Sequence, residues 1–122
     1  MRQISLGAVL AGLVAAILAI LLPATLAVGQ DATAVAEGEK LAFDRTKGNC
    51  LACHMIDGGD LAGNIGPPLL SMQQRFPDRA QLRAQIWDST TKNPGTIMPP
   101  FGRHKMLSEE EIDWITDYVH SL

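Results

Sequence analysis

The sequence contains only two cysteines, carries no excess of positive charge and shows no alternating pattern typical of a β-strand. Two cysteines cannot build a disulfide framework of several bridges, so a small domain must stabilise its core by other means. The formal net charge of −3 excludes an obvious nucleic-acid partner. The 122 residues allow one domain, and the lack of strand patterns predicts that it is all-α.

Residues 1–27 are expected to be a signal peptide. Arg2 makes the start basic, residues 6–22 form an unbroken apolar run, and small residues follow Pro23. This pattern is typical of secretory signal peptides. The run is also nearly long enough for an uncleaved membrane anchor, which stays open as the alternative. In both cases the domain, residues 28–122, is expected outside the cytoplasmic membrane, in the periplasm.

Apolar periodicity and capping residues predict a small helical domain. Ser108 and Glu111 form a capping-box pattern that opens the last helix. Gly38 either marks a close crossing with another helix or is a tolerated surface glycine. Trp87 is expected to fill the core, although packing against a bound prosthetic group is the alternative. The clearest helices are expected at residues 34–44, 71–76, 78–89 and 108–121.

Cys50, Cys53 and His54 form a Cys-X-X-Cys-His motif, which is the pattern of covalent haem c attachment. Both thiols can form thioethers with the porphyrin, and the imidazole lies one helical turn after Cys50, within reach of the iron. The porphyrin would also supply the centre of a small core. Three other interpretations are a structural disulfide, a redox-active pair, and a zinc site shared with His104 and His120. The redox pair lacks its strand–helix–strand context, and the zinc site lacks its usual ligand spacing.

Two proline-rich segments are expected to complete the haem site. We expect the Pro67 carbonyl to accept the second ring N–H of His54, although a plain turn is the alternative. Met98 precedes two prolines and is favoured as the second axial ligand, because thioether sulfur is common in cytochromes c. If Met98 only fills the core, the iron would be five-coordinate or bound by His104. The alternative ligands are Met106, His104 and Lys105.

Residues 50–54 and 66–69, Met98 and the capped C-terminal helix together resemble class I cytochrome c. The resemblance covers essentially all of residues 28–122. It implies an all-α fold of four or five helices wrapped around one covalently bound haem c. It also implies that the N- and C-terminal helices cross at Gly38, against the face that contains Tyr118.

Residues 47–54, 85–88 and 93–104 resemble, more narrowly, the X subunits of the sulfur-oxidising (Sox) cytochrome pairs. The Met-Pro-Pro-Phe-Gly-Arg-His run at residues 98–104 is the most specific part. The resemblance implies an electron-transfer subunit without catalytic residues, paired with a larger, SoxA-like c-type cytochrome. Such a pair is an L-cysteine S-thiosulfotransferase that joins thiosulfate to a SoxYZ-like carrier. Electrons then pass through the His54/Met98 haem to a downstream cytochrome.

Two other functions are compatible with the same sequence features. The chain could be an independent electron carrier between respiratory complexes, or a redox or ligand sensor in which Met98 is labile. A run of three basic residues after the expected ligand loop either steers a partner electrostatically or forms a solvated loop. These residues are Arg103, His104 and Lys105.

Overall fold

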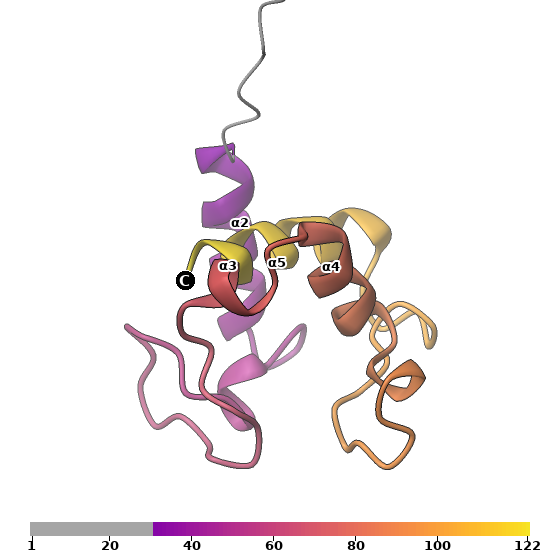
Figure 1. Cartoon of the computed structure of the whole chain (residues 1–122). Coiled ribbons are helices and arrows are strands. Elements are labelled where there is room, and N and C mark those ends of the chain that lie inside the picture. The colour runs from indigo at the N-terminus through magenta and orange to yellow at the C-terminus, as the bar shows by residue number, and fades with distance from the viewer. Residues whose placement is uncertain (1–30) are drawn as a thin grey trace, which may run out of the picture.

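The computed structural model describes residues 31–122, so the expected signal peptide lies outside the described residues. The elements follow in the order α2 (Ala32–Phe43), η2 (Cys50–Ala52), α3 (Met72–Arg75), α4 (Arg79–Trp87), η3 (Ser89–Thr91) and α5 (Glu109–Ser121), where η marks a 3₁₀ helix (Figure 1). No strand occurs between residues 31 and 122, which confirms the predicted all-α class. Within the same range, no helix is long and apolar enough to cross a membrane.

Side-chain caps decide where the longer helices begin. A carboxylate oxygen of Asp31 accepts the Thr33 N–H at 2.9 Å, so α2 starts two residues before the expected position. The predicted capping box of α5 is confirmed. Ser108 Oγ accepts the Glu111 N–H at 3.1 Å, and the Glu111 carboxylate accepts the Ser108 N–H at 2.8 Å. Asp78 caps α4, as its sequence position predicted.

The two terminal helices, α2 and α5, cross at Gly38. A Cβ atom at this position would lie 2.5 Å from the Trp114 carbonyl carbon and 2.8 Å from Tyr118 Cβ. The helices therefore touch backbone to backbone, and the predicted crossing against the Tyr118 face is confirmed. The rings of Phe43 and Tyr118 meet edge to face beside it, with centroids 5.9 Å apart.

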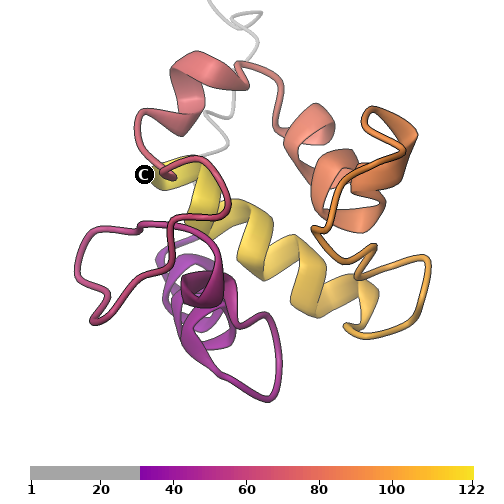
Figure 2. The same ribbon diagram turned by 90° about the horizontal axis from the view of Figure 1, so that it is seen from below.

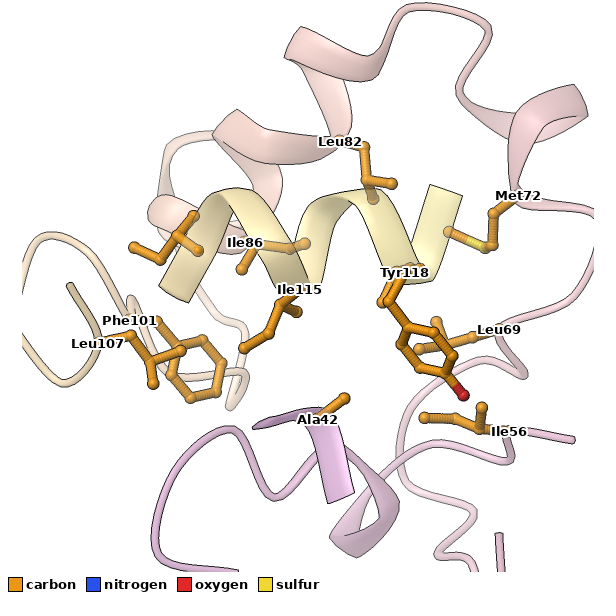
Figure 3. Close-up of a cluster of buried hydrophobic side chains, with 12 residues drawn as sticks. Ala42, Ile56, Leu69, Met72, Leu82, Ile86, Phe101, Leu107, Ile115 and Tyr118 are labelled. Atoms are coloured by element: carbon orange, nitrogen blue, oxygen red, sulfur yellow. The ribbon is translucent and has the colours of Figure 1, made fainter. Parts of the chain in front are cut away.

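Buried apolar side chains gather on the inner side of α5 (Figure 3). Ile115 and Tyr118 come from α5, Ile86 comes from α4 and Ala42 comes from α2, while Leu69 reaches the same cluster from a loop. All five are less than one tenth exposed. Burial of such side chains stabilises a domain by about 1.5–3 kcal/mol each. The core therefore joins all three long helices to the loop that follows the Cys-X-X-Cys-His motif.

An ion-pair ladder aligns α4 on α5. Arg83 Nε donates to the Asp113 carboxylate at 2.6 Å, and the same guanidinium pairs with Glu109. One turn away, Arg79 pairs with Asp117. Partly exposed pairs contribute at most about 1 kcal/mol each, so the ladder orients α4 more than it stabilises the fold. That orientation matters because the C-terminal end of α4 leads into the loop that carries Met98.

Candidate haem site

A cavity of about 810 Å³ lies between two long loop segments of the domain. Figures 1 and 2 show these segments, residues 44–71 and 88–107, extending separately from the helices. Both segments line the cavity, and Ile115 and Val119 of α5 line it as well. Cofactor and ligand sites typically occupy about 300–1,000 Å³, so this cavity has the size of a cofactor site.

The Cys-X-X-Cys-His motif lies on one wall of the cavity. The 3₁₀ helix η2 begins at Cys50, at a position where no apolar period predicts a helix. Asn49 precedes it with φ 48°, a left-handed conformation that asparagine tolerates and that turns the chain into η2. The His54 N–H donates to the Cys50 carbonyl at 2.8 Å, which is the helical-turn spacing expected from the sequence. Cys50, Cys53 and His54 all line the cavity.

The competing interpretations of the two cysteines find no support in the site. Burial raises the pKa of the Cys50 thiol to about 11, whereas a thiol–disulfide exchange protein needs a lowered cysteine pKa. No disulfide joins Cys50 and Cys53. Among residues 31–122, no three His, Cys, Asp or Glu side chains are grouped closely enough to hold a zinc ion. His120 lies with its Nε2 atom 3.0 Å from the Phe76 carbonyl oxygen.

The orientation of the His54 ring is set by a proline loop. Its Nδ1 atom lies 2.7 Å from the Pro67 carbonyl oxygen. Since a carbonyl oxygen can only accept, Nδ1 carries the proton and Nε2 keeps its lone pair for a metal ion. The Arg75 guanidinium donates to the neighbouring Pro68 carbonyl at 2.7 Å, which fixes the loop itself. The ring is thus presented in the tautomer that a metal ligand requires.

Met98 lines the cavity from the other loop segment, where its side chain is half-buried. Two other methionines also line it, but each differs in its surroundings. Met72 is 2% exposed and packs in the core, with its sulfur accepting from Arg75 at 3.1 Å. Met106 is 50% exposed and lies at the rim. Met98 therefore combines partial burial with a place on the loop segment that is separate from the one carrying the Cys-X-X-Cys-His motif (Figures 1 and 2).

The basic residues at the cavity are not the ones that the sequence singled out. None of Arg103, His104 and Lys105 lines the cavity, and Arg103 instead pairs with Asp88 at 3.2 Å. The cavity is lined by Arg45, Lys47 and Arg75, which sequence reasoning missed. Arg45 and Lys47 lie a few residues before Cys50, and this proximity was the only sequence feature that indicated a place at the cavity. Arg103, His104 and Lys105 are exposed, so a role in steering a partner stays a prediction.

The residues around the cavity fit a haem c group. Two thiols and an imidazole on one wall match the covalent attachment chemistry, and a thioether sulfur on the facing segment matches a second axial donor. Most of the remaining lining is apolar, as an apolar macrocycle requires. Its buried members are Leu69, Met72, Leu82, Ile86, Phe101, Leu107, Ile115 and Val119.

The helical fold and this set of donors define a c-type cytochrome, and one covalently bound haem c is its cofactor. Residues 33–119 match the family described as cytochrome c oxidase, cbb3-type, subunit III. The chain belongs to this cytochrome c family, whose match spans nearly all of the described residues.

Known proteins that are similar to the chain include a solved structure and a curated relative. The crystal structure of SoxXA from P. pantotrophus shares the fold with a TM-score of 0.64 and 25% sequence identity, over 70% of this chain and 79% of that one. An uncharacterized lipoprotein of Aquifex aeolicus (strain VF5) is 39% identical over 75 residues, which are 61% of this chain and 36% of that protein. The chain thus spans about a third of the length of this relative. Together with the family match, the SoxXA likeness supports a SoxX-like class I cytochrome.

Proposed function

We propose that the chain transfers electrons as the X-type subunit of a periplasmic, thiosulfate-oxidising cytochrome pair. In this proposal Cys50 and Cys53 hold the haem, and His54 and Met98 are its axial ligands. The observation that carries the proposal is the single cavity that both loop segments line, one with the attachment motif and the other with Met98. When bound, the haem supplies a one-electron redox centre.

The chain's own residues then limit the chemistry to electron transfer. With His54 and Met98 in the two axial positions, no coordination position remains for a substrate. The buried side chains of Ile86, Ile115 and Val119 keep water from the cavity wall. Methionine ligation and an apolar wall both favour the ferrous state and raise the reduction potential. No catalytic residue is therefore expected on this chain.

The close approach of Gly66 to the His54 ring allows a test of His54 as an axial ligand. A Cβ atom at Gly66 would lie 2.6 Å from His54 Nδ1 and 2.9 Å from Nε2. Gly66→Ala is therefore expected to displace the imidazole and to convert more than about half of the ferric protein to high spin, while the thioethers keep the haem attached. Electron paramagnetic resonance of the ferric variant measures this change.

The control for this experiment is Gly95→Ala. At that position the nearest atom to an added Cβ is the Asn93 side-chain oxygen, at 3.8 Å, so the ferric spectrum should remain that of the parent protein. A Gly66→Ala spectrum identical to the parent spectrum would show that His54 is not held at the iron in this way.

The Sox assignment rests on the likeness to SoxXA together with the Met-Pro-Pro-Phe-Gly-Arg-His run at residues 98–104. By this proposal the partner is a larger, SoxA-like c-type cytochrome that carries the catalytic haem. A SoxYZ-like carrier holds the thiosulfate-derived group, and a downstream cytochrome accepts the electrons. The periplasmic location follows from the signal-peptide pattern in residues 1–27.

Reconstitution with partner proteins tests the proposed role. The tagged full chain is co-expressed with the larger c-type cytochrome of the same organism and is expected to co-purify with it. Thiosulfate should then reduce the haem of this chain only when that cytochrome and the sulfur carrier are both present. Reduction is followed by the ferrous absorption bands, with the chain alone as the control.

An independent carrier between respiratory complexes is the second candidate, and the family description connects the domain with a respiratory oxidase. The same reconstitution separates the two functions. If the chain purifies alone and stays ferric with thiosulfate and both partners, but is reduced rapidly by a quinol-oxidising complex, the Sox role is wrong.

A further inference from the structure

Ser89 is a fully buried polar residue that lies between α4 and the Met98 loop. Its side chain is 0% exposed, and it begins the short helix η3 directly after α4. The hydroxyl donates to the carbonyl oxygen of Met98 at 2.8 Å, across nine positions of the chain. A buried hydroxyl is kept only where it is satisfied, and here the acceptor belongs to the candidate ligand residue.

This bond closes a ring of four hydrogen bonds through the loop. The Ser89 carbonyl accepts the Asn93 N–H at 3.1 Å, and the Asn93 carbonyl accepts the Thr96 N–H at 3.0 Å. Thr96 Oγ1 then accepts the Met98 N–H at 3.1 Å. Both main-chain polar groups of Met98 are therefore bonded to side-chain hydroxyls, those of Ser89 and Thr96.

The residues beside Ser89 fasten the ring to α4. The Asp88 carboxylate accepts from the Thr90 N–H at 3.0 Å and from the Arg103 guanidinium at 3.2 Å, which ties both ends of the loop together. The Trp87 carbonyl, at the end of α4, also accepts the Gly102 N–H at 3.0 Å. Because α4 is aligned on α5 by the ion-pair ladder, Ser89 is held by the rigid part of the domain.

We propose that Ser89 is a positioning residue that keeps the Met98 side chain presented to the haem iron, with Thr96 as its counterpart on the Met98 N–H. The inference rests on the assignment of Met98 as axial ligand under the proposed function. Fixing the carbonyl of Met98 stops the peptide unit before Pro99 from turning. Without that bond, the loop moves more freely, and the sulfur leaves the iron more often.

Competition by imidazole for the ferric iron measures how firmly Met98 is held. The full-length ferric protein is titrated with imidazole at fixed pH, and the absorption change gives an apparent dissociation constant. Ser89→Ala and Thr96→Val each remove one hydroxyl, so each is expected to lower this constant by about fivefold to tenfold. The reason is that imidazole then competes with a Met98 sulfur that is held less firmly at the iron.

Two matched variants separate this role from ordinary stability. Thr96→Ser keeps the hydroxyl and should bind imidazole like the parent protein. Thr116→Val removes another buried hydroxyl, which donates to the Ile112 carbonyl within α5, away from the cavity. It should also leave the constant unchanged.

The outcomes distinguish this inference from the ligand assignment. If the Met98→Ala variant lacks the absorption band of iron–methionine coordination, Met98 is the ligand. If Ser89→Ala and Thr96→Val nevertheless bind imidazole like the parent protein, Ser89 does not position Met98. An equal change in Thr116→Val would also overturn the inference, because general loosening would then explain the effect. If Met98→Ala keeps the band, the ligand assignment itself fails.

Discussion

Met98→Ala is expected to abolish the weak absorption band at about 695 nm that marks ferric iron–methionine coordination. The haem should stay attached, because Cys50 and Cys53 hold it independently of the axial ligands. With the sulfur removed, carbon monoxide should bind readily to the ferrous variant at neutral pH, whereas the parent protein should resist it. Absorption spectroscopy of both oxidation states measures these effects.

The matched control is Met106→Ala. Met106 also lines the cavity but is half exposed at its rim, so its removal should leave the band in place. Loss of the band in Met106→Ala and its persistence in Met98→Ala would transfer the ligand role to Met106. The sensor interpretation gains support only if carbon monoxide also binds readily to the parent protein.

Gly38→Ala is expected to lower the free energy of unfolding by about 2 kcal/mol or more, although alanine is the better helix former. The added methyl group would lie 2.5 Å from the Trp114 carbonyl carbon, which belongs to the backbone of α5. Backbone cannot rotate out of the way as a side chain can, so α2 and α5 must separate. Chemical denaturation followed by circular dichroism measures the loss.

Glu39→Ala is the control for this substitution. Glu39 is the next residue of α2 and is exposed, so its replacement should change the free energy of unfolding by less than about 0.5 kcal/mol. If Gly38→Ala proves as stable as Glu39→Ala, the helices do not cross as closely at this position as the structure places them.

Local patterns in the sequence were sufficient to predict the longer helices and the crossing of the two terminal helices. The Ser108–Glu111 capping box and the Asp78 cap are short-range signals, and both helices begin where these residues indicate. Gly38 indicated the helix crossing because a glycine inside a helix is destabilising, unless a neighbouring element packs too closely for a side chain. Trp87 lies outside the cavity lining and packs against the core, in agreement with the expectation.

The features that sequence reasoning missed depend on contacts between distant residues. The ladder between α4 and α5 joins residues 26 to 38 positions apart, as in the Arg83–Glu109 and Arg79–Asp117 bonds, and no local pattern marks such pairs. The role of Ser89 could not be predicted from the sequence either, because serine is common in loops. Its partner is a main-chain carbonyl, which every residue has and which no residue type marks. The pairing of Arg103 with Asp88 likewise depends on how the whole loop folds back.

The resemblance and the geometry support different parts of the functional conclusion. The cavity, the attachment motif and the family match establish a c-type cytochrome without reference to any partner. The sulfur-oxidation role depends on the likeness to SoxXA and on residues 98–104. If reconstitution shows no binding to the larger cytochrome, the sulfur-oxidation role is wrong, but the chain is still an electron-transfer protein.

The magnetic and optical spectra of the unaltered ferric protein show whether His54 and Met98 are the two axial ligands. The expected result is a fully low-spin signal together with the weak band at about 695 nm. A high-spin signal would show that one axial position is open. A low-spin signal without the band would show that a nitrogen or oxygen donor has taken the place of Met98.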